Sequence, residues 1–169
     1  LGDGFDCVAF EQLAQDGRAQ RETFVREFAS QLAEQASQAC LRGDDAALME
    51  LLASGMDANH VDDDGYPPLC TAASYGESKC LAMLLGVAGI DVNKANSQGG
   101  TPLFCAAQNG HAECVTLLLA RPDIDVNKSE LITPLFMAAA NGHAEVLRLL
   151  LAHPQTDVNQ ADNLGRTPL

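Results

Sequence analysis

Apolar residues recur three and four positions apart in a series of short segments, a pattern that predicts amphipathic helices. Three of these segments carry aliphatic side chains at matching places: Leu81, Leu84 and Leu85, then Val115, Leu118 and Leu119, then Val146, Leu149 and Leu150. An alanine-containing segment precedes each one and ends at a glycine, the residue that favours the left-handed conformation just past a helix end. The chain is therefore predicted to form pairs of short helices joined by tight turns.

A longer stretch upstream has the same helical spacing. Its apolar positions are Phe24, Phe28, Leu32, Ala36 and Ala39. They predict one helix from about Arg18 to Leu41 that covers the open end of the array. Residues 1–17 also carry apolar side chains, and the sequence leaves open whether they form a further short helix on this one or a flexible linker.

Three short motifs repeat along the chain with one shared period. The first is Thr-Pro-Leu, at Thr101, Thr133 and Thr167, with Pro67-Pro68-Leu69 as a variant, and its prolines are 34, 32 and 34 residues apart. The others are Asp-Val-Asn and Gly-His-Ala-Glu. Threonine before proline predicts a helix start, because the hydroxyl accepts a free amide hydrogen and proline has none to leave unpaired. Helix pairs with one apolar face bury it by stacking on copies of themselves.

These motifs resemble the ankyrin repeat, a turn followed by two antiparallel helices of about 33 residues. The resemblance covers roughly residues 30–169 and implies an all-α solenoid of stacked helix pairs with β-hairpin-like turns. It also divides the chain. The predicted parts are an N-terminal helical extension or linker (1–29), a capping repeat (about 30–61), repeats at about 62–95, 96–128 and 129–161, and the start of a further repeat (162–169).

One connection departs from the pattern. The segment from Asn127 to Thr133 is two residues shorter than its neighbours and carries Leu131 and Ile132 in place of the Asp and Gly found between Asp62 and Gly65. Ankyrin turns project as fingers beside the inner helices, so the resemblance implies a short, apolar finger here.

The charge of the chain excludes several classes of partner. A formal net charge of −13 repels phosphate backbones and anionic lipid, so we expect neither nucleic acid nor a membrane surface as partner. The longest apolar stretches fall well short of the roughly 20 residues that cross a bilayer, and the acidic N-terminus is unlike a secretion signal. We expect a cytoplasmic protein. Since the chain begins without methionine and stops within a repeated motif, we expect a piece of a longer polypeptide.

Six cysteines and four histidines raise the question of metal or nucleophile chemistry. Cys80 and Cys114 occupy the repeat position that Val146 fills, so cysteine acts there as a medium apolar side chain. Stacked helices lie about 8–10 Å apart, beyond disulfide reach, and we expect reduced thiols. His111 and His143 follow the turn glycine, where the resemblance implies hydrogen bonding within the turn. No ligand set has metal-binding spacing, so no metal, cofactor or catalytic residue is expected.

Four asparagines each follow an aspartate by two residues and a leucine by eight. They are Asn59, Asn93, Asn127 and Asn159. One interpretation is an amide that hydrogen-bonds across the hairpin turn. The other is that the pattern resembles the sites at which asparaginyl hydroxylases modify ankyrin repeats.

The resemblance implies a binding surface made of hairpin tips and the exposed edges of inner helices. Carried over repeat by repeat, its positions are Asp63, Asp64, Tyr66, Ser74 and Tyr75; Ser97, Gln98, Gln108 and Asn109; Glu130, Ile132 and Asn141; and Leu164 and Arg166. The first group combines carboxylates with two tyrosines, which suits a basic partner. A solvated turn at Asp62–Asp64 is the alternative for its acidic part.

Three hypotheses about function follow. The first is a protein-interaction module that binds a partner protein through its concave face and is not an enzyme. The second is a substrate-recruiting region of a larger enzyme or effector whose catalytic domain lies outside these residues. The third is self-association, because the apolar face of the Val146–Leu151 region is predicted to lack a covering repeat.

Overall fold

The structure is a computed structural model that describes residues 18–128, 132–161 and 164–168. Within these residues the chain forms eight α-helices and no strand, which confirms the predicted all-α class. The helices are α2 (Arg18–Arg42), α3 (Asp45–Ala53), α4 (Pro68–Tyr75), α5 (Ser78–Leu85), α6 (Pro102–Asn109), α7 (Ala112–Leu119), α8 (Pro134–Ala140) and α9 (Ala144–Ala152).

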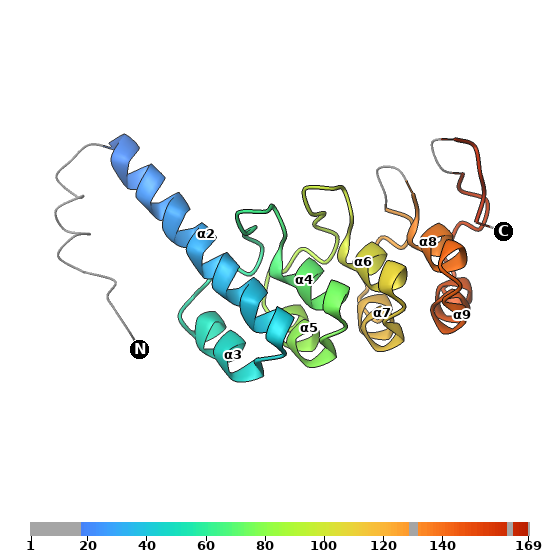
Figure 1. The fold of residues 1–169 in the computed structure, drawn as a ribbon, viewed down its shortest axis with the longest axis horizontal. Helices are drawn as coiled ribbons and strands as arrows, with labels where there is room; N and C mark the ends of the chain where they lie inside the picture. The colour runs from blue at the N-terminus through green and yellow to red at the C-terminus, as the bar shows by residue number, and fades with distance from the viewer. Residues whose placement is uncertain (1–17, 129–131, 162–163, 169) are drawn as a thin grey trace.

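The helices form two layers. The inner layer is α2, α4, α6 and α8, the outer layer is α3, α5, α7 and α9, and the loops that lead into α4 and α6 project to the same side (Figure 1). Each helix packs against its partner in the pair and against the equivalent helix of the neighbouring pair. This arrangement is the predicted solenoid of stacked helix pairs.

Helix α2 acts as the inner helix of the first pair and covers one side of α4. Its bounds match the helix predicted from about Arg18 to Leu41. The division predicted between residues 29 and 30 lies inside α2, which continues through it without a break. The predictions for residues 1–17 and for the tip of the Asn127–Thr133 finger lie outside the described residues.

The predicted helix starts are confirmed at two inner helices. The hydroxyl oxygens of Thr101 and Thr133 accept hydrogen bonds from the backbone N–H groups three residues later, both at 3.2 Å. Pro67 holds the equivalent place before α4 and makes no side-chain cap. Helix α8 ends at Ala140, slightly before the glycine at which its end was predicted.

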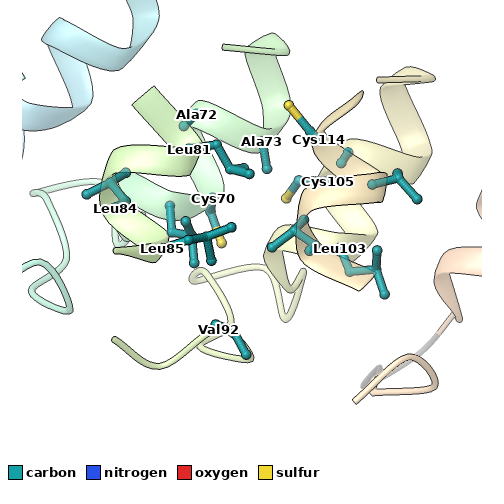
Figure 2. Packing of buried hydrophobic residues seen from close by; sticks show 14 of the residues in the cluster. Cys70, Ala72, Ala73, Leu81, Leu84, Leu85, Val92, Leu103, Cys105 and Cys114 are labelled. Carbon is teal, nitrogen blue, oxygen red and sulfur yellow. The ribbon is translucent and has the colours of Figure 1, made fainter. Parts of the chain in front are cut away.

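The core lies between the two layers and follows the predicted positions. Leu81, Leu84 and Leu103 are fully buried, and Figure 2 shows Leu81 and Leu85 together with Cys70 and Ala72 in the same buried cluster. Such leucine burial stabilises by about 1.5–3 kcal/mol for each side chain. Each pair of helices shares this apolar surface with the next pair, so the repeats stabilise one another.

The asparagine amides bind the following repeat, which corrects the interpretation of a bond across the hairpin turn. Asn93 Nδ2 donates to the carbonyl oxygen of Asp123 at 2.7 Å, and its Oδ1 accepts from the N–H of Asp125 at 2.8 Å. The local turn is closed by the aspartate, whose carboxylate accepts from the asparagine N–H. The same pair of bonds joins Asn59 and Asn127 to their next repeats. The repeats are therefore joined by polar as well as apolar contacts.

Replacing Asn93 with alanine is expected to lower the free energy of unfolding by about 1–2 kcal/mol, since two hydrogen bonds between repeats are lost. Urea unfolding measures the change. Asn159→Ala is the matched control, because in the described part of the chain the Asn159 amide group has no such pair of bonds. Equal losses in the two variants would contradict the structural role assigned to Asn93.

The histidines also act between repeats rather than within the turn, which corrects the second local prediction. His111 Nε2 lies 3.0 Å from the carbonyl oxygen of Ser74, and His143 Nε2 lies 2.9 Å from that of Gln108. A carbonyl oxygen only accepts, so each Nε2 carries the hydrogen. Each ring thereby joins the start of an outer helix to the end of the inner helix in the preceding repeat.

The last outer helix is less exposed than predicted. Val146 and Leu150 are fully buried, and Leu151 is 45% exposed. The apolar surface at this end is therefore centred on Leu151, and self-association through it stays a prediction.

Candidate functional site

A groove of about 450 Å³ lies on the inner-helix side of the stack, over α2, α4 and the end of the loop that joins α3 to α4. Its lining comes from three inner helices and that loop, and consists of Glu34, Ser37, Gln38, Leu41, Asp62, Asp64, Tyr66, Thr71, Ser74, Tyr75 and Asn109. We call this the concave groove. Its volume falls in the range of about 300–1,000 Å³ that is typical of binding sites.

Asp62 holds the groove wall in place. One carboxylate oxygen accepts from the Ser37 hydroxyl and the other from the Tyr66 N–H, both at 2.7 Å. Thr71 in turn donates to Ser37 at 3.4 Å. Asp62 is only 8% exposed. Asp62 is therefore a buried structural group. In the turn Asp62–Asp64, only Asp63 and Asp64 are exposed to solvent.

The structure brings five of the predicted binding residues together in the concave groove. They are Asp64, Tyr66, Ser74, Tyr75 and Asn109. Tyr75 is 55% exposed, whereas Tyr66 is half-buried. Asp63 is exposed next to Asp64 but does not line the groove.

The remaining predicted residues lie elsewhere, and several take part in contacts of the stack. Ser97 donates its hydroxyl to the carbonyl oxygen of Asp64 at 2.8 Å, and Asn141 Nδ2 donates to that of Gln108 at 2.8 Å. Gln98 is exposed and Ile132 is half-buried. Glu130 lies outside the described residues. Leu164 is 72% exposed, and the Arg166 guanidinium lies 5.4 Å from the centre of the Phe136 ring.

Sequence reasoning missed four groove residues on α2: Glu34, Ser37, Gln38 and Leu41. The helix was predicted as a cover for the stack, with no surface role. A signal was present in the register of the turn glycines, because Leu41 precedes Gly43 by two residues just as Ser74 precedes Gly76. That register places Leu41 on the exposed edge of an inner helix, where it is 42% exposed.

The concave groove is negatively charged. Glu34, Asp62 and Asp64 line it, and none of the described lining residues is lysine or arginine. Partial burial raises the pKa of Tyr66 above its ordinary value, and the neighbouring Cys105, Cys70 and Asp62 groups add to the effect. The phenol therefore stays protonated and can donate a hydrogen bond to a ligand.

The buried thiols differ: a hydrogen bond with Cys70 lowers the pKa of Cys105, whereas three other thiols are unsuited to nucleophilic chemistry. The five cysteines in the described part of the chain are free and buried. Burial raises the pKa of Cys80 and of Cys114 to about 11 in each case, and that of Cys40 further. At neutral pH these thiols are protonated, and the thiolate is the reactive form.

The described residues lack two features. No group of three His, Cys, Asp or Glu side chains is placed to hold a metal ion. Over the same residues, none of the helices combines the length and apolar character that crossing a membrane requires.

The repeated geometry defines a class: a helical repeat protein whose stacked pairs present one row of inner helices and loops. The family model for ankyrin repeats in three copies matches residues 36–130, and the model for a single ankyrin repeat matches residues 130–163. The chain belongs to the ankyrin-repeat family, whose repeats are generally protein-interaction modules. No curated protein matches its sequence.

Proposed function

We propose that this chain is a protein-interaction module, without catalytic activity of its own, that holds a segment of a partner protein in the concave groove. The observation that supports it best is the concave groove itself, in which an exposed aromatic ring and acidic side chains surround a hollow of about 450 Å³. Aromatic side chains of this kind commonly dominate binding energy at protein interfaces.

The position of the concave groove also supports the proposal. The inner faces of α4 and α6 toward the core are formed by small buried residues such as Ala72, Ala73 and Ala106. The larger side chains of Tyr75 and Asn109, at the C-terminal ends of the same helices, line the concave groove. Packing of the stack does not require a tyrosine at position 75, where the side chain is 55% exposed.

The partner is proposed to be basic at the contact, and the module to work in a reducing compartment such as the cytoplasm. The net charge of −13 and the acidic lining favour association with a positively charged surface. The free, buried thiols fit a reducing compartment.

Replacing Tyr75 with alanine is expected to reduce capture of partner proteins by about tenfold or more, the loss typical of an aromatic interface residue. Quantitative affinity capture with the chain as bait measures it. Because Tyr75 is 55% exposed, the melting curve of the Tyr75→Ala variant is expected to stay close to that of the original chain. The double variant with Tyr66→Ala is expected to lose more.

Met49→Ala is the matched control for Tyr75→Ala. Met49 is an apolar residue of the outer helix α3 with 60% exposure, far from the lining of the concave groove. Loss of the same partners in both variants, or in neither, would overturn the proposed surface. So would a loss of binding that simply follows a loss of fold.

A further inference from the structure

The carboxylates of the concave groove differ in how much of their hydrogen-bonding capacity the fold uses. Both carboxylate oxygens of Asp62 already accept a hydrogen bond, one from the Ser37 hydroxyl and one from the Tyr66 N–H. Glu34 accepts one bond, from Gln38 Nε2 at 3.0 Å, through Oε1. Asp64 takes part in the stack through its backbone carbonyl, which accepts from Ser97. Glu34 Oε2 and the Asp64 carboxylate therefore have capacity for a ligand.

The concave groove spans three helices, which sets the kind of ligand that fits. Glu34 and Gln38 belong to α2, Tyr75 to α4 and Asn109 to α6. Two steps between packed helices of about 8–10 Å each give a length of roughly 16–20 Å. An extended peptide covers that length with about five or six residues at about 3.4 Å each. A peptide segment fits this length better than a compact small molecule does.

The chemistry of the lining selects among basic side chains. Two carboxylates from different elements and an exposed tyrosine ring line the same hollow, and no lysine or arginine among the described lining residues competes for them. A guanidinium is planar, presents five donors in a fixed fork and can also stack on an aromatic ring, so it can bond to more than one carboxylate oxygen at once. A lysine ammonium is a compact point charge that does not stack in this way.

We infer that the concave groove takes an extended peptide segment across α2, α4 and α6, receives one arginine side chain of it at the carboxylates of Glu34 and Asp64, and contacts the same segment through Tyr75. This inference rests on the proposed function, because it names the partner chemistry of the same surface. It makes arginine the specificity-determining residue of the partner, and Glu34 and Asp64 the residues that recognise it.

The test uses the whole chain, labelled with ¹⁵N, and three soluble peptides of identical glycine, serine and alanine sequence with a single central arginine, lysine or citrulline. Citrulline has the shape of arginine without its charge. In NMR titrations the arginine peptide is expected to shift the amide signals of residues around the concave groove, and to bind about threefold more tightly than the lysine peptide and about tenfold more tightly than the citrulline peptide. Asp64→Asn is expected to weaken arginine-peptide binding by about threefold or more.

Asp63→Asn is the matched control for Asp64→Asn, since it removes the same charge from an adjacent exposed residue outside the groove lining. Equal weakening by the two variants would show diffuse attraction to an acidic protein and would overturn the inference. Equal binding of the arginine and citrulline peptides in the concave groove would also overturn it, while leaving the proposed function standing. Absence of shifts at the groove residues would overturn it as well, and the Tyr75→Ala capture experiment then decides the proposed function separately.

Discussion

Replacing Gly110 with alanine is expected to lower the free energy of unfolding by about 2–4 kcal/mol, more than the backbone strain alone explains. Gly110 ends α6 with φ of 78°, in the left-handed region that costs an ordinary residue about 1–2 kcal/mol. An added Cβ would also lie 2.6 Å from Nδ1 and 2.8 Å from Cε1 of the His143 ring. The ring cannot move away freely, because its Nε2 is hydrogen-bonded to the carbonyl oxygen of Gln108.

The chain supplies a matched control for this variant. Gly142 has nearly the same backbone conformation, with φ of 73°, but no described atom lies within 4 Å of the position of an added Cβ. Gly142→Ala is therefore expected to show only the backbone part, about 1–2 kcal/mol. Urea unfolding of both variants separates the two contributions. The double variant Gly110→Ala with His143→Ala tests the contact directly, because removing the ring relieves the clash and the two losses should not add. Strictly additive losses would contradict the contact.

Replacing Leu85 with alanine is expected to lower the free energy of unfolding by about 2–4 kcal/mol, the cost of removing a buried leucine and leaving a cavity. Leu85 ends α5 and is 8% exposed, within the cluster that joins α5 to the neighbouring helices. Its carbonyl oxygen also accepts from Arg121 Nη1 at 3.2 Å, so the next repeat covers this end of α5. Thermal and urea unfolding measure the loss.

Leu151 is the control, because it occupies the same repeat position eight residues before the asparagine. At 45% exposure it has much less apolar area to lose, and Leu151→Ala is expected to change the free energy of unfolding by less than about 1 kcal/mol. A large loss at Leu151 would indicate that its side chain is buried in solution, as in self-association. Light scattering at two protein concentrations distinguishes that case.

The groove was only partly predictable from the sequence. Tyr66, Ser74 and Tyr75 were placed on the binding surface because the resemblance to ankyrin repeats implies such a surface at hairpin tips and at the exposed edges of inner helices. Asp62 was grouped with the exposed acids, but burial against Ser37 makes it structural, and those two residues are 25 positions apart. Glu34 and Gln38 were missed because α2 continues far beyond the length of a repeat helix and its pattern showed only which face is apolar.

The asparagine and histidine contacts also separate what the sequence could predict from what it could not. The asparagine amides were interpreted as bonding across the hairpin turn, and the ankyrin resemblance implied hydrogen bonds within the turn for the histidines. Asn93 instead reaches Asp123, 30 residues away, and His111 reaches Ser74, 37 residues away. Such partners are adjacent only after the repeats have stacked.

The sequence by itself determined the period, the helix starts at Thr101 and Thr133, the ends of α4 and α6 at Gly76 and Gly110, and the apolar positions of the core. Each of these depends on residues within about one helical turn, or on a spacing that repeats. The tertiary structure decided which polar groups join neighbouring repeats and which side chains of α2, α4 and α6 meet in the concave groove. Those contacts depend on how one repeat lies against the next, and the stacking of apolar faces fixes that geometry only when the chain is folded.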